Sequence, residues 1–158
     1  MLRRWRIKRT GGGTFKDNFA DGERELLRNL LPQLRELVTS PPGSVDDRVR
    51  RLFPTAYADD PERDAEYQRF MREELIASRV AAIEQVEATL DAKELDEAQL
   101  LGWMQSVNAV RLVLGTMLDV SEDDTIDHLA EDDPDVHNYA LYGYLSGLLD
   151  EMVTVLSD

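Results

Sequence analysis

Residues 100–118 constrain the fold of this chain more than any other stretch, because they are almost entirely uncharged and carry Arg111 as their single formal charge. At 100° per residue, their apolar side chains cover more than half of the circumference of an α-helix. A helix that is apolar over so much of its surface must be enclosed by other elements. We therefore predict a mainly α fold, a helical bundle around a buried central helix at about residues 97–118, with Asp96 as its N-cap.

Two polar residues interrupt the apolar stripe of this helix: Arg111 lies near its centre and Asn108 near its edge. A buried arginine needs carboxylate or carbonyl partners, because an unpaired buried charge costs several kcal/mol. The candidate partners are four carboxylates earlier in the chain: Asp59, Asp60, Glu73 and Glu74. We favour a structural tie between the central helix and the segment around residues 52–62. In the alternative interpretation, Arg111 and Asn108 line a pocket for a small anionic ligand, which the planar guanidinium group suits.

The charge of the chain is strongly asymmetric. Residues 1–111 hold all 18 basic residues against 20 acidic ones, whereas residues 112–158 hold 12 acidic residues and no Lys or Arg. The total charge of −14 argues against tight, sequence-independent DNA binding, which depends on many cationic contacts with phosphates. It favours a soluble protein that meets basic partners or simply stays in solution.

Residues 1–20 are predicted to form a β-hairpin, because Trp5 and Ile7 alternate with basic residues and three consecutive glycines at 11–13 provide a turn. The candidate contacts with nucleic acid or an acidic partner are the basic side chains of the first strand: Arg3, Arg4, Arg6, Lys8 and Arg9. In the interpretation that we favour, the strand lies against the acidic C-terminal half of the same chain or is solvated. No helix-turn-helix pattern accompanies it.

The predicted bundle occupies residues 21–158 and, with the hairpin, forms a single domain over residues 1–158. We expect Asp21 to cap a helix over residues 22–39. Pro32 is expected to interrupt this helix, because proline removes a backbone donor.

The longest helix is predicted over residues 61–90, starting at Asp60-Pro61, with Tyr67 and Phe70 on its core-facing apolar line. Residues 119–137 are expected to form an acidic loop. The last helix is predicted over residues 138–156.

In the last helix, Gly143 and Gly147 have a spacing that allows another helix to approach closely. We expect this face to pack on Gly102, Ser106 and Ala109 of the central helix, either within one chain or across a two-fold axis. The second arrangement would make the protein a homodimer.

No pattern for catalysis or for cofactor binding is evident in the chain. The acidic loop holds both histidines, which suit several divalent ions, but the glycine that a calcium-binding EF-hand requires is missing. A nucleophile elbow, a Walker loop and a zinc-binding histidine pair are also missing. The 158 residues contain no cysteine, which excludes disulfides and thiol switches. We therefore predict a solvated loop, no metal, no cofactor and no enzymatic activity.

No stretch reaches the roughly 20 uncharged apolar residues that a membrane span requires. The basic N-terminus is followed by Gly and polar residues, so it does not read as a signal peptide. We expect a cytoplasmic protein with no membrane contact.

Two motifs, LFPTAYADDPE at residues 52–62 and DEAQLLGWMQSVNAVRLVLGTMLDVSEDD at residues 96–124, resemble an actinobacterial family of unknown function (DUF2017). The resemblance covers nearly the whole chain. It implies a mostly helical cytosolic protein, often encoded beside the adaptor of the Clp protease, and some relatives are labelled transcriptional regulators. The family has no established catalytic residues. Two departures are Pro32, where relatives tend to have an uninterrupted helix, and the absence of cysteine, which excludes thiol-based regulation here.

These observations favour a non-enzymatic regulatory or protein-interaction module, related to transcription or to the stress response, with a protein partner. The first alternative is a DNA-binding transcriptional regulator that uses the basic N-terminal strand. The second alternative is a small protein that binds an anionic ligand at Arg111. Binding of nucleic acid has the weaker support, because the chain is acidic as a whole.

Overall fold

The computed structural model describes residues 5–39, 52–53, 55–118 and 135–157. Its elements, in chain order, are β1 (Ile7–Arg9), β2 (Phe15–Asp17), α1 (Asp21–Val38), α2 (Pro61–Thr89), β3 (Glu94–Leu95), α3 (Glu97–Met117) and α4 (Val136–Ser157). The prediction of a mainly α protein with an N-terminal β-hairpin is confirmed. None of the described helices is long and apolar enough to cross a membrane.

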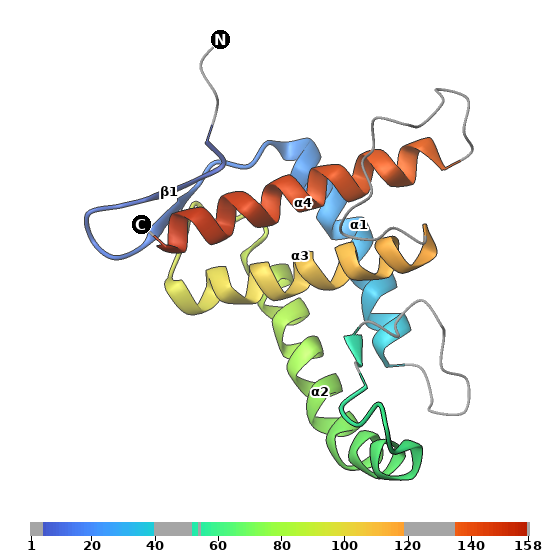
Figure 1. Ribbon diagram of the computed structural model, residues 1–158. Coiled ribbons are helices and arrows are strands. Elements are labelled where there is room, and N and C mark those ends of the chain that lie inside the picture. The colour runs from blue at the N-terminus through green and yellow to red at the C-terminus, as the bar shows by residue number, and fades with distance from the viewer. Residues whose placement is uncertain (1–4, 40–51, 54, 119–134, 158) are drawn as a thin grey trace.

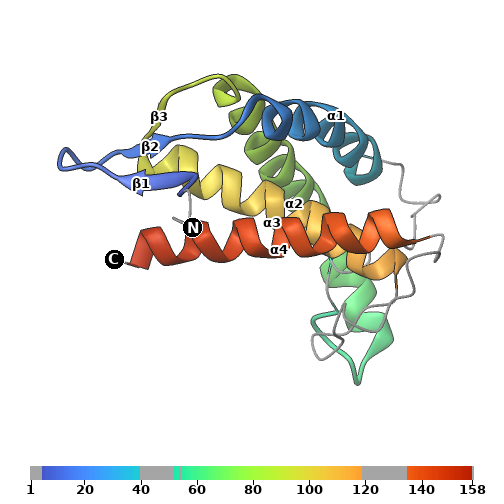
Figure 2. The same ribbon diagram turned by 90° about the horizontal axis from the view of Figure 1, so that it is seen from above.

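Helix α3 is the centre of the molecule, as its sequence predicts. It runs antiparallel to α4, while α1 and α2 cross this pair (Figures 1 and 2), and its most extensive contacts are with α2 and α4. Leu100 and Val107 on its apolar stripe are buried, and so are Ser106 and Ala109 on its small, uncharged side. Both sides of α3 are therefore covered by protein.

Close packing explains the small residue Gly102 of α3. A Cβ atom at this position would lie 2.5 Å from Oε1 and 3.3 Å from Cβ of Gln85 in α2. The neighbouring Trp103 is fully buried, stacks on Phe19 at 5.1 Å between ring centroids, and donates its indole N–H to Thr89 Oγ1 at 2.7 Å. Because a buried indole N–H needs an acceptor, this bond fixes the end of α2 against α3.

Helix α1 differs from the prediction at two points. Its N-cap is Ala20, not Asp21, because Glu23 three residues later accepts the Ala20 N–H at 2.8 Å and supplies the capping bond from within the helix. The helix also continues through Pro32, so the predicted interruption is wrong. The Pro32 ring faces solvent, while Leu31 and Leu34 beside it are buried and hold the helix in place.

The predicted hairpin is part of a three-stranded antiparallel sheet in the order β1-β2-β3. Gly13 provides the turn with a φ of 83°, which glycine adopts without strain. Phe15 pairs with Leu95 of β3, and both are buried together with Ile7. One face of the sheet therefore closes the end of the helical core.

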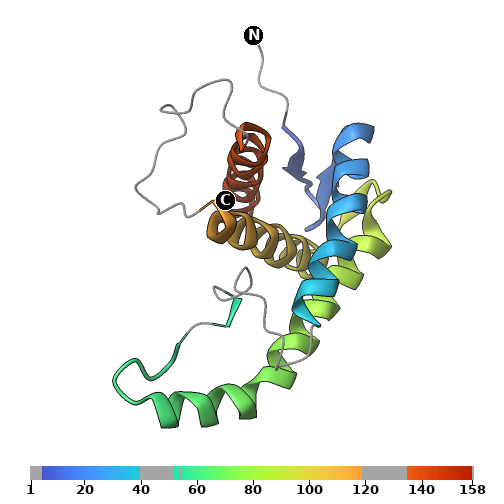
Figure 3. The ribbon, with the colours of Figure 1, turned by 90° about the vertical axis from the view of Figure 1, so that its right-hand side faces the viewer.

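Helix α2 is close to its predicted limits and is capped by Asp60, whose carboxylate accepts the Arg63 N–H at 3.1 Å. Its first buried residue is Ala82. Ile76 is half-buried and also packs against the core, and Figures 1 and 3 show that the first turns of the helix leave the body of the molecule. We call residues 61–75 the α2 arm.

Candidate functional site

Arg111 and Asn108 lie together, as their spacing on α3 predicts. The Nε and Nη2 atoms of Arg111 donate to Asn108 Oδ1 at 3.4 and 3.3 Å, and its Nη1 donates to the Tyr142 hydroxyl of α4 at 3.0 Å. The guanidinium carbon also lies 5.6 Å from the centre of the Tyr142 ring. The arginine is half-buried, so it links α3 to α4 and keeps contact with solvent.

The predicted ion pair between Arg111 and an earlier carboxylate is absent from the described residues. All four candidates are exposed and belong to the α2 arm or to the loop before it: Asp59, Asp60, Glu73 and Glu74. The tie expected between α3 and this segment is therefore wrong. A tyrosine hydroxyl and an amide suffice as partners, because Arg111 is not cut off from water.

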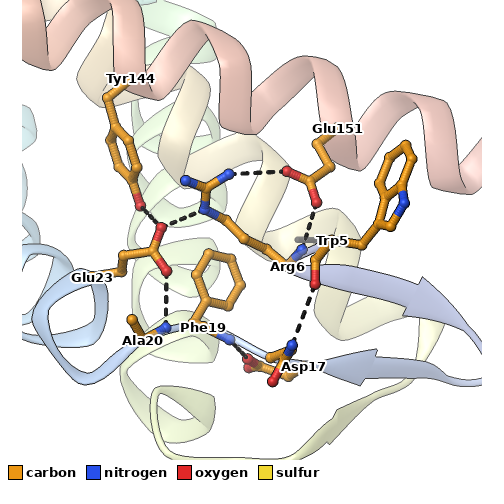
Figure 4. Close-up of polar contacts among 9 residues, drawn as sticks. Trp5, Arg6, Asp17, Phe19, Ala20, Glu23, Tyr144 and Glu151 are labelled. Atoms are coloured by element: carbon orange, nitrogen blue, oxygen red, sulfur yellow. Dashed lines mark hydrogen bonds and ion pairs between the residues drawn. The ribbon is translucent and has the colours of Figure 1, made fainter. Parts of the chain in front are cut away.

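Four side chains, from the residue that precedes β1 and from helices α1 and α4, form a polar cluster that fastens the start of β1 to the helices (Figure 4). They are Arg6, Glu23, Tyr144 and Glu151. The Arg6 N–H donates to Glu151 Oε1 at 2.6 Å and its Nη1 donates to Glu151 Oε2 at 3.2 Å. Arg6 Nε pairs with Glu23, and the guanidinium carbon lies 5.4 Å from the centre of the Tyr144 ring. Arg6 therefore connects β1 with α1 and α4 at once.

The charges of this polar cluster satisfy one another. Glu151 is only 4% exposed, and Glu23 accepts the Tyr144 hydroxyl at 2.9 Å as well as the Ala20 N–H. Burial alone would raise the pKa of Glu23, but hydrogen bonds from Arg6, Ala20 and Tyr144 outweigh it and lower this pKa. Burial and the neighbouring Glu23 raise the pKa of Tyr144. Near neutral pH the Glu23 carboxylate is therefore charged and paired with Arg6. This indicates a structural role for the polar cluster.

A second carboxylate supports the same corner of the molecule. Asp17 Oδ1 accepts the Phe19 N–H and Arg24 Nη2, both at 3.0 Å, while its Oδ2 has no partner within the described structure. Burial raises the pKa of Asp17, although the Phe19 amide and Arg24 act against this shift. Arg24, in the first turn of α1, also donates to the carbonyl of Leu90, the C-cap of α2. The pair of Asp17 and Arg24 therefore links β2 to the start of α1 and to the end of α2.

Sequence reasoning missed Glu151, although the chain contains a signal for it. Glu151 follows Leu148 by three residues and precedes Val155 by four, and both of these are buried. At helical spacing, an acidic residue in such a row faces the core. A buried carboxylate of this kind needs a cation, and the basic N-terminal strand supplies it.

Two arginines of the basic strand, Arg6 and Arg9, form contacts within the same chain. This is the interpretation that the sequence favours. Arg3 and Arg4 lie outside the described residues. Arg6 belongs to the polar cluster, and Arg9 donates to the carbonyls of Val155 and Leu156 at 3.1 and 3.3 Å. The side chain of Lys8 is exposed.

The LFPTAYADDPE segment begins in the core, where Leu52 is buried, and its later residues build the tip of the α2 arm. Asp64 Oδ1 accepts the N–H groups of Ala56 and Tyr57 at 2.7 and 3.1 Å, which folds the preceding loop back onto the helix. Tyr57 then meets Tyr67 edge-on at 5.9 Å between ring centroids, and the Arg63 guanidinium covers the Tyr57 ring at 4.4 Å. The tip is therefore held in one shape by its own residues.

Two aromatic side chains of the tip, Tyr67 and Phe70, face solvent. The prediction that they face the core is wrong. Phe70 is 79% exposed and Tyr67 is exposed beside it. A hollow of about 250 Å³ is lined by Tyr57, Arg63, Glu66, Tyr67 and Phe70; we call this surface the aromatic tip. Apolar periodicity identifies the apolar face of a helix, but it does not reveal whether another element covers that face.

Gly147 of α4 does not make the predicted contact with Gly102 within the chain. A Cβ atom at Gly147 would meet no atom within 4 Å, and Gly102 is approached by Gln85 of α2 instead. Gly143 is half-buried. A homodimer through the exposed side of this helix stays a prediction.

The acidic loop falls mostly outside the described residues. At its end, Asp135 and His137 are exposed. Where the structure describes the chain, no group of three or more His, Asp or Glu side chains is placed to hold a metal ion.

Comparison with known proteins gives one family and several relatives. Residues 2–156 match the family described as Domain of unknown function (DUF2017). The proteins named oxidative stress regulator AosR from Mycobacterium bovis and Mycobacterium tuberculosis are each 27% identical to this chain over 194 aligned positions, which cover 99% of this chain and 88% of the relative. No solved protein structure gives a significant match.

Proposed function

The chain belongs to the DUF2017 family, whose function is unknown, and from this premise we propose that it is a non-enzymatic regulatory protein that acts by binding another protein. The binding surface is the aromatic tip of the α2 arm. The regulated process is transcription or the response to stress.

The exposed Phe70 at the end of a projecting helix is the observation that carries this proposal. Covering a phenylalanine side chain contributes about 1.5–3 kcal/mol, and this chain leaves that contribution unused in its own fold. Tyrosine and arginine are enriched among the residues that dominate binding energy at interfaces, and Tyr57, Tyr67 and Arg63 surround Phe70. Because Asp64 fixes the loop to the helix, little conformational entropy is lost when a partner binds.

The relatives named oxidative stress regulator AosR support a regulatory role. The 158 residues of this chain contain no cysteine. A response to oxidants in this protein therefore does not use a thiol of its own.

The two alternatives from the sequence have less support. A DNA-binding strand needs cations that are available to phosphates, whereas Arg6 and Arg9 are engaged within the chain. An anion site at Arg111 needs donors that face the ligand together, whereas Asn108 and Tyr142 already accept three of the five N–H groups of this guanidinium.

Affinity purification from the native cytosol with matched variants tests the proposal. We expect the wild-type protein and Leu101→Asp, which changes an exposed apolar residue of α3 outside the aromatic tip, to recover the same protein partner at moderate salt. Phe70→Asp should lose it, with at least a tenfold weaker affinity once that partner is purified, because a charge replaces a central apolar contact.

Circular dichroism and gel filtration of Phe70→Asp must show that the variant keeps the wild-type fold. Recovery of the partner by Phe70→Asp as well as by the wild type would overturn the proposed surface. Recovery of DNA alone, lost as salt rises, would replace the proposed function by the DNA-binding alternative.

A further inference from the structure

Strand β1 lies at one edge of the three-stranded sheet. The Arg6 carbonyl accepts the Asn18 N–H at 2.7 Å and the Thr10 N–H donates to Thr14 at 2.9 Å, both on the side of β2. Backbone groups alternate in direction along an antiparallel strand. The N–H and C=O groups of Ile7 and Arg9 therefore point to the outer side, where no described strand pairs with β1.

A groove runs along this outer edge, between β1 and the last turns of α4. It encloses about 310 Å³ and is lined by Trp5, Ile7, Lys8, Arg9, Thr154 and Val155. Trp5 is 49% exposed, and Val153 next to the groove residues of α4 is exposed as well. The groove thus combines an open strand edge, an aromatic side chain and an apolar floor.

The charge around the groove is opposite to that of the rest of the molecule. The chain carries −14 in total, yet the two charged residues that line the groove, Lys8 and Arg9, are both basic. Lys8 lies directly opposite Lys16 in the sheet, and both are exposed. Like charges in direct cross-strand positions repel each other and opposite charges attract. Lys16 already has Glu94 of β3 directly opposite it on its other side, whereas Lys8, at the sheet edge, has a cross-strand neighbour only in Lys16 among the described strands, so an acidic residue is favoured beside Lys8.

We propose that this groove binds an extended, acidic segment of a partner protein as an additional strand beside β1. The backbone of the segment pairs with the outer groups of Ile7 and Arg9, as in strand addition to a sheet edge. Its carboxylates face Lys8, and an apolar side chain of the segment enters the hollow beside Trp5. This surface is separate from the aromatic tip and does not depend on it.

A peptide fits the groove better than a nucleic acid does. Strand pairing uses amide groups, which a phosphate backbone lacks. DNA binding relies on several cations that face outward together, whereas the Arg9 guanidinium caps carbonyls at the end of α4 and Arg6 pairs with Glu23 and Glu151. Lys8 is therefore the cation that we assign to the carboxylates of the bound segment.

Titration with a short synthetic peptide of alternating glutamate and valine, blocked at both ends, tests the proposal on the full chain. Trp5 is half-exposed while Trp103 is fully buried, so a change in tryptophan fluorescence reports on the groove. We expect saturable binding at low salt that weakens as salt rises, because screening reduces the attraction between exposed charges. A peptide of alternating lysine and valine should not bind.

Two variants and one modified peptide sharpen the test. Lys8→Glu should weaken binding at least tenfold, whereas Lys93→Glu, an equal change at an exposed residue outside the groove, should leave it unchanged. The same acidic peptide with alternate backbone nitrogens methylated keeps its charges but loses strand pairing, and it should not bind. Phe70→Asp should bind the peptide as the wild type does, which separates this test from that of the proposed function.

Several results would overturn the proposal. They are the absence of binding at low salt, equal binding of the lysine peptide, an unchanged affinity in Lys8→Glu, and full binding of the methylated peptide. Binding of a DNA duplex with the same dependence on Lys8, in place of the peptide, would assign the groove to nucleic acid instead.

Discussion

The polar cluster and the aromatic tip both contain carboxylates, arginines and tyrosines, but the two regions differ in how far these residues are buried. In the cluster, Glu151 is buried, Arg6 is half-buried, and every charge has a partner. At the tip, Arg63 and Tyr57 stabilise each other at the surface and leave Phe70 uncovered. The comparison teaches that charged residues hold elements together in one region, whereas the other region leaves an apolar side chain uncovered, which we propose is used for binding.

The two regions also differ in what a substitution should change. A buried ion pair persists only while both partners are present, because each charge alone is costly to bury. An exposed aromatic residue contributes little to the fold that displays it. Substitutions in the polar cluster should therefore change stability, and substitutions at the aromatic tip should change binding.

The largest effect is expected for Glu151→Ala. It removes the acceptor of the Arg6 amide and of its guanidinium in one step. Because the Arg6 side chain is one-third exposed and can recover some solvation, we expect a loss of about 2–3 kcal/mol in the free energy of unfolding, below the roughly 3–5 kcal/mol of a fully buried pair. Urea denaturation measures it. Asp150→Ala, at the exposed neighbouring position, should stay within about 0.5 kcal/mol of the wild type.

An intermediate effect that depends on pH is expected for Glu23→Gln. At neutral pH it weakens hydrogen bonds to a charged group and should cost about 1–2 kcal/mol. Glu23 has a lowered pKa in the folded protein, so its contribution is present above the ordinary value of 4.5 and is lost as pH falls through the lower, folded pKa.

Urea denaturation at a series of pH values should therefore show that the wild type and Glu23→Gln converge in stability below the ordinary glutamate pKa. Asp17, whose pKa is raised by burial, contributes in the opposite direction in both proteins. A constant difference between the two proteins down to acid pH would show that the Glu23 charge plays no part in the cluster.

The smallest effect on stability is expected for Phe70→Ala, which should change the free energy of unfolding by no more than about 0.5 kcal/mol. Phe19→Ala is the matched substitution in the core, where the same side chain is buried against Trp103, and it should cost about 3–5 kcal/mol. Thermal unfolding of both variants checks the contrast. A large loss in Phe70→Ala would mean that the α2 arm packs on the body of the protein, contrary to the comparison.

Local features of the fold were predictable from the sequence. Asp60 and Asp96 cap their helices as expected, because a cap bonds to backbone groups only three residues away. The position of α3 at the centre followed from its composition, because few of its side chains are polar or charged.

Features that depend on which elements meet were not predictable. Arg111 was assigned to carboxylates before α2 or on its arm, but Tyr142 of α4 lies beside it. Tyr67 and Phe70 have the spacing of core-facing residues in a helix. This spacing does not reveal that the first turns of α2 extend beyond the other helices. Pro32 was expected to break α1, but burial of Leu31 and Leu34 outweighs one missing backbone bond.

The bond between Arg6 and Glu151 also sets an order of events during synthesis. These residues are 145 positions apart in the chain, and contacts between distant positions form late because they close the longest loops. Since domains fold as they leave the ribosome, the N-terminal hairpin emerges well before the helix that neutralises its arginine. Until α4 follows, Arg6 lacks its Glu151 partner, so the polar cluster is completed only after α4 has been made.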